Sequence, residues 1–93
     1  MYRIKFERKF QKSLEKLKKN GLQKRHRDTL YSIIATLAEG NKLGPEYRDH
    51  KLKGELSDYR ECYIQGDLLL VYQIVKDELV LVLLDIGTHA DLF

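Results

Sequence analysis

The sequence has one cysteine, one proline and no tryptophan among its 93 residues. Because Cys62 has no partner within the chain, an internal disulfide is excluded. A lone thiol suits a reducing compartment, so a cytoplasmic protein is expected. The first ten residues are charged throughout and lack the apolar core of a signal peptide. The longest apolar runs, 68–72 and 79–84, are much shorter than the ~20 residues of a membrane-spanning helix, so no membrane association is expected.

Motifs for bound metals and nucleotide cofactors are also missing. The histidines, at positions 26, 50 and 89, stand 24 and 39 residues apart, and no HxH, CxxC or HExxH spacing occurs. No metal site is therefore expected. Without a glycine-rich phosphate-binding loop, a nucleotide cofactor is not expected either. Cys62 lies in an alternating, strand-like segment, which favours a buried structural thiol over a nucleophile.

Positive charge is concentrated in the first half of the chain. Residues 1–53 hold 15 Lys and Arg against 6 Asp and Glu, whereas residues 54–93 hold 2 against 8. The basic half can attract a polyanion such as nucleic acid, or an acidic segment of a protein partner. Two solvated helix faces would produce the same composition, so charge alone leaves these readings open.

Apolar spacing predicts a strand and two helices in the basic half. Residues 2–6 alternate as in a strand, and from Glu7 the spacing changes to that of an amphipathic helix. This helix ends at Asn20-Gly21, a pair that suits a left-handed helix stop. A second helix is predicted over 22–39. Its inward-facing residues are expected to be Leu30, Ile33, Ile34 and Leu37.

Three further strands are predicted after a polar loop at 40–58. They are 59–64, 67–76 and 78–86, and the second is almost entirely apolar, as expected of a central strand. The predicted fold is α+β with the order β-α-α-β-β-β, in one domain over residues 1–93. An N-terminal strand and a helical hairpin pack on one face of a mostly antiparallel sheet. The other face of the sheet is then free for a ligand.

The histidines are the side chains best suited to proton exchange near neutral pH. His26 lies on the basic second helix and is expected on the surface. His89 follows a strand, behind Gly87. His50 lies in the loop RDHKLKG, where its basic neighbours are Arg48, Lys51 and Lys53. A polar loop residue and a hydrogen-bonded chain-terminal residue are the plainer readings of His50 and His89.

Two histidines, carboxylates and a basic platform together are what metal-free RNA cleavage requires. A base takes the proton of the 2′-hydroxyl, an acid protonates the departing 5′-oxygen, and cations stabilise the charge on phosphorus. Asp67, at the entry of a strand, and Glu61 could orient an imidazole or accept a proton. Which histidine is the base and which the acid does not follow from the sequence.

Residues 47–93 contain four blocks: DHxLxG, YRECxI, DLLLVY and GTHxxLF. In this order and at these spacings they resemble the YafQ branch of the RelE toxin superfamily, bacterial ribosome-dependent mRNA interferases. The first half of the chain matches only in layout. The resemblance implies a RelE-like microbial ribonuclease fold. It also implies a toxin of a type II toxin–antitoxin system that cleaves mRNA in the ribosomal A site, with an operon-encoded antitoxin.

The resemblance further implies which residues form the site. His50, Asp67 and His89 fall on the family's loop histidine, strand-entry aspartate and C-terminal histidine. Phe93 falls on its closing phenylalanine, and Glu61 on a position that is acidic in this branch. The expected catalytic set is therefore His50, Glu61, Tyr63, Asp67, His89 and Phe93. The residues expected to hold RNA phosphates are Lys51, Lys53 and Arg60.

Two positions depart from the family pattern. The branch commonly has His where this chain has Tyr63, and Arg where it has Asp85. Tyrosine is a poor base at neutral pH, but it can donate a hydrogen bond, stack on a nucleobase or act as an acid. An aspartate would oppose phosphate charge if it pointed into the site. A metal-independent endoribonuclease is expected, weakened by these two residues.

The alternative is a non-catalytic toxin or binding module on the same fold. It would be gyrase-inhibitor-like, or a transcriptional co-repressor acting with its antitoxin. Tyr63 and Asp85 favour this alternative, whereas the GTHADLF end favours the enzyme. The expected partners are an antitoxin with an acidic, apolar C-terminal part, the ribosome and mRNA, and operator DNA only through the antitoxin. No cofactor is expected.

Overall fold

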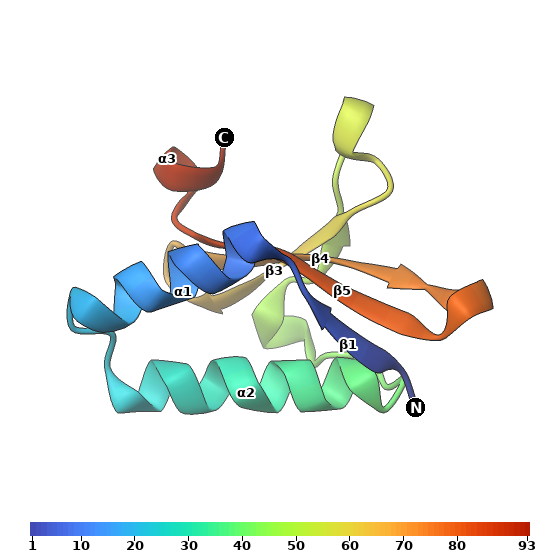
Figure 1. The fold of residues 1–93 in the computed structure, drawn as a ribbon, viewed down its shortest axis with the longest axis horizontal. Coiled ribbons are helices and arrows are strands. Elements are labelled where there is room, and N and C mark those ends of the chain that lie inside the picture. The colour runs from blue at the N-terminus through green and yellow to red at the C-terminus, as the bar shows by residue number, and fades with distance from the viewer.

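The computed structural model describes all of residues 1–93 and contains one five-stranded mixed sheet (Figure 1). The strand order is β1-β5-β4-β3-β2, in which β1 runs parallel to β5 and every other neighbouring pair is antiparallel. The strands are β1 (Arg3–Phe6), β2 (His50–Lys51), β3 (Arg60–Gln65), β4 (Leu68–Val75) and β5 (Val80–Gly87).

Three helices accompany the sheet: α1 (Arg8–Lys19), α2 (Lys24–Ala38) and the short α3 (His89–Leu92). Lysines occupy the last turn of α1, where positive charge is favourable because the carbonyl end of a helix is negative. The chain then reverses at Gly21, whose φ of +89° is in the left-handed region that glycine adopts without strain. The predicted helical hairpin and α+β fold class are confirmed.

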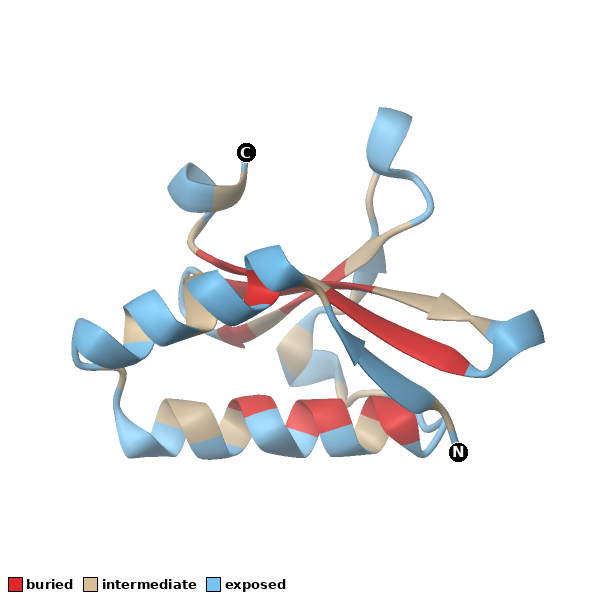
Figure 2. Ribbon diagram, viewed as in Figure 1, coloured by how far each residue is buried: buried red, intermediate tan, exposed pale blue.

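The hydrophobic core lies between the helices and one face of the sheet. The predicted inward residues of α2, among them Leu30 and Ile33, are buried, and Phe10 of α1 joins them. From the sheet, Cys62, Leu70, Tyr72, Leu81, Leu83 and Ile86 complete this cluster. Figure 2 shows the buried residues on the inner side of α2 and along β4 and β5. Each fully buried large side chain of this kind contributes about 1.5–3 kcal/mol to stability.

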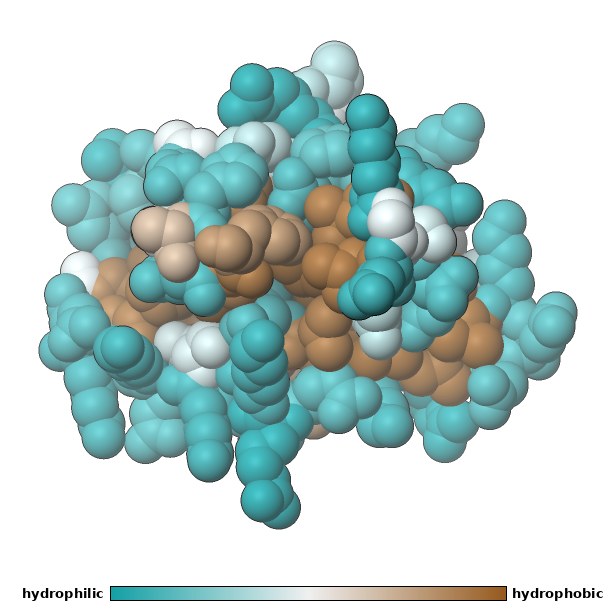
Figure 3. Space-filling model, turned by 90° about the horizontal axis from the view of Figure 1, so that it is seen from above, coloured by the Kyte–Doolittle hydropathy of each residue, from teal (hydrophilic) through white to brown (hydrophobic).

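The opposite face of the sheet carries the side chains that alternate with the core. Successive side chains of a strand point to opposite faces of the sheet. Because Cys62 and Ile64 of β3 point to the core, Glu61 and Tyr63 lie on the opposite face. In Figure 1, α3 and the 3₁₀ turn Gly54–Leu56 both rise on the side of the sheet away from α2. Seen from that side, the protein has an apolar floor between hydrophilic margins (Figure 3).

The loop predicted over 40–58 contains more structure than expected. Two 3₁₀ turns lie in it, and the two-residue strand β2 pairs with β3 at the edge of the sheet. The helix α3 was also not predicted, because four residues are too few for a periodic pattern. None of the helices combines the length and apolarity needed to cross a bilayer.

Candidate active site

His50 and Glu61 form the first of two histidine–carboxylate pairs. They are cross-strand neighbours on β2 and β3, with Nε2 of His50 2.7 Å from Oε1 of Glu61. The other ring nitrogen, Nδ1, donates to the carbonyl oxygen of Arg48 at 2.7 Å. Because a carbonyl only accepts, Nδ1 is the ring nitrogen that carries the hydrogen of this contact. The Glu61 carboxylate is therefore placed to pair with the imidazole when Nε2 carries a proton.

His89 and Asp67 form the second pair. Asp67 follows Gly66 in the β3–β4 turn, where Gly66 adopts a φ of +51°, and His89 is the first residue of α3. Nδ1 of His89 donates to Oδ1 of Asp67 at 3.0 Å, while Nε2 makes no hydrogen bond within the protein. The His89 side chain is 47% exposed, so Nε2 is open to a ligand. This ring can exchange a proton without any rearrangement.

A capping box fixes the helix that carries His89. The Thr88 hydroxyl accepts a hydrogen bond from the backbone N–H of Asp91, and the Asp91 carboxylate accepts one from that of Thr88. These hydrogen bonds, the backbone one first, lower the pKa of Asp91. The reciprocal bonds satisfy amide groups that a four-residue helix would otherwise leave free, and so hold the helix start in place.

Tyr63 lies between the two pairs. Its ring centroid is 6.5 Å from that of His50 and 5.9 Å from that of His89. The Phe93 ring continues the series, 6.0 Å beyond His89 and 58% exposed. Together His50, Tyr63, His89 and Phe93 make a row of rings across an exposed face, here called the aromatic row. Flat rings at this spacing offer stacking surfaces for nucleobases.

The structure brings the predicted catalytic residues together, but not the predicted RNA-binding set. Lys51 and Arg60 are cross-strand neighbours, one position along from His50 and Glu61, so they lie on the opposite face of the sheet. Lys53 lies beyond β2, exposed, and makes no ion pair. An RNA-binding role for these three residues stays a prediction. His26 is half-buried on α2, outside the aromatic row.

Arg60 instead belongs to a polar cluster on the core side of the sheet. Its Nε and Nη2 donate to the Asp49 carboxylate at 3.3 and 3.2 Å, and the Tyr72 hydroxyl donates to the same carboxylate. The hydrogen bond with Asp49 raises the pKa of Arg60, although burial opposes this. Burial raises the pKa of Tyr72, and its bond to Asp49 adds to the effect. Asp49 immediately precedes His50, so this cluster anchors the segment that carries that histidine.

Asp85, one of the two departures from the family pattern, does not point at the histidines. Val71 of β4 is the cross-strand partner of both Asp85 on β5 and Glu61 on β3. Asp85 and Glu61 therefore lie on the same face of the sheet, two strands apart. The Asp85 side chain is 5% exposed, and its carboxylate accepts from the Ser13 hydroxyl at 2.7 Å and lies 3.3 Å from Lys9 Nζ. Both partners belong to α1, so the negative charge is directed at that helix.

Sequence reasoning did not include Arg48 in the predicted site. Its guanidinium carbon lies 4.0 Å from the centroid of the Tyr63 ring, inside the aromatic row. The available signal was a basic residue two positions before His50. The direction of the Arg48 side chain depends on a left-handed backbone conformation, with a φ of 46°. An arginine rarely adopts this conformation, so the sequence does not predict it.

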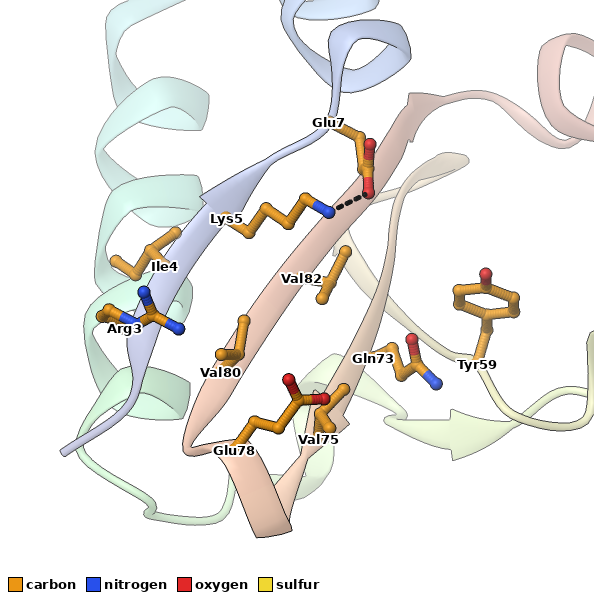
Figure 4. A pocket seen from close by; sticks show the side chains of 10 residues that line it. All are labelled: Arg3, Ile4, Lys5, Glu7, Tyr59, Gln73, Val75, Glu78, Val80 and Val82. Carbon is orange, nitrogen blue, oxygen red and sulfur yellow. Dashed lines mark ion pairs between the residues drawn. The ribbon is translucent and has the colours of Figure 1, made fainter.

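A cavity of about 500 Å³ lies on β1, β5 and β4, but none of the aromatic row lines it. Figure 4 shows valines 75, 80 and 82 in it, with Lys5 and Glu7 paired at its margin at 3.5 Å. This cavity holds no histidine, so the candidate active site is the open face around Tyr63.

The fold is that of toxins of type II toxin–antitoxin systems. A family model described as the bacterial toxin of type II toxin-antitoxin system, YafQ, matches residues 2–93. The chain belongs to this YafQ family. It is 35% identical over 74 residues to the mRNA interferase toxin YafQ of Escherichia coli K12, covering 76% of this chain and 78% of that protein.

Solved structures of related toxins superpose on this chain over nearly its full length. The metal-bound toxin from Helicobacter pylori is 46% identical, covers 100% of both chains and superposes with a TM-score of 0.90. The YafQ chain of the E. coli DinJ-YafQ toxin-antitoxin complex is 25% identical, with a TM-score of 0.86 over 99% of this chain and 97% of that one. The resemblance inferred from the four sequence blocks is thereby confirmed.

Proposed function

We propose that this chain is an mRNA-cleaving toxin, a ribosome-dependent endoribonuclease that acts by general acid–base chemistry. The observation that carries the proposal is the pair of histidine–carboxylate contacts on either side of Tyr63, on one exposed face. The family supports it, because the E. coli relative is named an mRNA interferase.

The two pairs suit different proton transfers. The imidazole of His89 is oriented by Asp67 and has Nε2 free, so it is assigned as the base that takes the 2′-hydroxyl proton. The 2′-oxygen then bonds to phosphorus and the bond from phosphorus to the 5′-oxygen breaks. His50, whose protonated ring would be paired with the Glu61 carboxylate, is assigned as the source of the proton that the departing 5′-oxygen accepts. Phe93 offers an exposed ring for stacking on a nucleobase, worth ~1–3 kcal/mol.

The chemistry is proposed without a resident metal. A metal is bound in the H. pylori toxin structure. In this chain no group of three or more His, Cys, Asp or Glu residues lies together. Each histidine has a single carboxylate partner, which is a smaller donor set than protein metal sites use. The residues present do not fit a bound metal, and no step passes through one.

A partner is proposed from the same comparison and from charge. One E. coli YafQ structure is a complex with DinJ. The excess of Lys and Arg in residues 1–53 suits an antitoxin segment that is acidic and apolar, and it suits ribosomal RNA equally. We expect a small acidic protein to copurify with the chain at moderate salt. Recovery of the chain alone at every salt concentration would argue against a toxin–antitoxin pair.

The test of the enzyme is cleavage of mRNA on programmed ribosomes, read by primer extension. His50→Ala and His89→Ala should each lower the cleavage rate ~10²-fold or more. If both variants cleave as wild type does, the proposal is wrong. Breaks in DNA rather than mRNA during growth arrest would instead support the gyrase-inhibitor-like alternative.

The acid and base assignments have a separate test. An mRNA with sulfur in place of the scissile 5′-oxygen has a leaving group that needs no proton. The defect of His50→Ala should largely disappear on this substrate, because the acid is no longer needed, while that of His89→Ala should remain. Rescue of His89→Ala instead would reverse the two assignments and leave the enzyme proposal intact.

A further inference from the structure

Arg48 is the one cation that the structure places inside the aromatic row. Its guanidinium carbon is 4.0 Å from the centroid of the Tyr63 ring, and Tyr63 is flanked by both histidines. Other nearby cations are directed elsewhere: Arg60 pairs with Asp49 on the core side, and Lys9 pairs with Asp85. A phosphate that enters between the histidines therefore meets Arg48.

The backbone of Arg48 is built for this placement. Apart from glycine, only Arg48 and Leu79 have positive φ, and the value at Arg48 is 46°. This left-handed turn directs the carbonyl of Arg48 to Nδ1 of His50 at 2.7 Å, while the side chain of the same residue lies over Tyr63. Such a conformation is unfavourable for an arginine and persists where the surrounding contacts require it.

Tyr63 suits a partner of positive charge. The face of a phenol ring is negative and attracts a guanidinium, whereas a protonated imidazole at the same position would repel it. Tyr63 is therefore a better platform for the Arg48 guanidinium than a protonated histidine would be. The planar guanidinium, held flat on the ring, presents a fork of N–H groups that matches two phosphate oxygens.

We propose that Arg48, stacked on Tyr63, binds the scissile phosphate and stabilises the charge that develops on it during cleavage. Tyr63 is then a positioning residue for Arg48, and its hydroxyl transfers no proton. This inference rests on the proposed function, since it names the phosphate-binding group of that same site.

Cleavage of mRNA on programmed ribosomes distinguishes the role of the Arg48 charge from that of the Tyr63 ring. Arg48→Gln should lower the rate ~10²-fold, the usual effect of removing one group that stabilises transition-state charge. Tyr63→Phe should cleave close to wild type, whereas Tyr63→Leu should lose about tenfold because the platform is gone. The double variant Arg48→Gln/Tyr63→Leu should be no slower than Arg48→Gln alone, since both changes remove one interaction. Lys76→Gln, which removes an exposed charge on the β4–β5 link, is the matched control.

The variant Arg48→Gly is the control for a folding defect. Glycine adopts the positive φ of this turn freely and keeps the carbonyl that holds His50, so this variant should fold as well as wild type by urea unfolding. It should nevertheless lose as much cleavage as Arg48→Gln. If Arg48→Gly and Arg48→Gln both cleave like Lys76→Gln, Arg48 binds no reacting phosphate. If Tyr63→Phe falls as far as Arg48→Gln, the hydroxyl is the active group and the platform role is overturned.

A binding measurement distinguishes this inference from the proposed function. The probe is a trinucleotide with 2′-deoxyribose at its first and central positions, which cannot be cleaved because neither phosphodiester has a neighbouring 2′-hydroxyl. Titration followed by NMR should shift the Arg48 Nε–Hε signal, and Arg48→Gln should weaken binding about tenfold. A wild-type protein that binds this probe through Arg48 but cleaves no mRNA would contradict the proposed function alone. A protein that cleaves mRNA while Arg48→Gln binds and cleaves as wild type would contradict the inference alone.

Discussion

Glu61 and His50 face each other across the β2–β3 ladder, 2.7 Å apart, and the carboxylate is the buried member of the pair. The Glu61 side chain is 5% exposed and that of His50 is 48% exposed. The second oxygen of Glu61, Oε2, is buried without a hydrogen-bond partner. The imidazole of His50 is therefore the one side-chain partner that the structure gives this carboxylate.

Replacement of this carboxylate tests its part in the proton transfer by His50. Glu61→Gln keeps the shape, but an amide donates to Nε2 without supplying a proton that can be transferred. We expect the rate of mRNA cleavage to fall ~10²-fold in single-turnover assays. Glu55→Gln, on the exposed turn after β2, is the matched control and should be neutral. Equal rates for the two variants would remove Glu61 from the chemistry.

Arg60 is predicted to stabilise the fold instead of binding RNA. Arg60→Gln leaves Asp49 with fewer donors and should lower the free energy of unfolding by about 1–2 kcal/mol, a value reduced because the arginine is partly exposed. Urea unfolding measures this. The affinity for the uncleavable trinucleotide should not change, because Arg60 lies across the sheet from His50. A weaker affinity with unchanged stability would restore Arg60 to the RNA-binding set.

Asp85 is predicted to have little influence on the reaction. Its charge is met by Lys9 and Ser13, so Asp85→Asn should change the cleavage rate less than about fivefold. The same change weakens two contacts of a buried carboxylate and should lower the free energy of unfolding by about 1–2 kcal/mol. The cleavage rate and the urea unfolding of the same variant measure these two effects separately. A large gain in rate would show that Asp85 does oppose the phosphate.

Cys62 is predicted to be unreactive in the folded protein. Burial raises the pKa of its thiol to about 12, and the charges of Asp49 and Glu61 add to this. At pH 8 the thiolate fraction is then lower than in the unfolded chain by about 10³-fold. Iodoacetamide should label the protein readily in urea and very slowly in buffer. Rapid labelling of the folded protein would contradict the burial of this side chain.

The same shift makes stability depend on pH at the alkaline end. The folded thiol keeps its proton while the unfolded thiol loses it near pH ~9, so stability is full below that pH and falls as the pH rises toward 12. Burial raises the pKa of Tyr72 as well, which acts in the same direction. Urea midpoints should therefore fall from pH 8 to pH 10.5. Cys62→Ala should show a shallower fall, although its midpoint at pH 8 is lower.

Much of this protein follows from its sequence. Local apolar spacing predicted α1, α2 and the long strands, because a helix or strand buries one face whatever lies opposite it. The inward residues of α2 and the burial of Cys62 followed from the same periodicity. The family also followed from the sequence, because the blocks around His50, Tyr63 and His89 keep their order and spacing along the chain.

Only the tertiary structure decided how the polar side chains are paired. The two-residue strand β2 has no periodicity of its own, and its register with β3 is what joins His50 to Glu61 and sends Arg60 to Asp49 on the other face. The contact of Asp85 with α1 spans 72 residues to Ser13, a distance that no local pattern encodes. The position of Arg48 on Tyr63 depends on one left-handed turn. Pairing of this kind is set by strand register and backbone direction, which arise only when distant segments pack together.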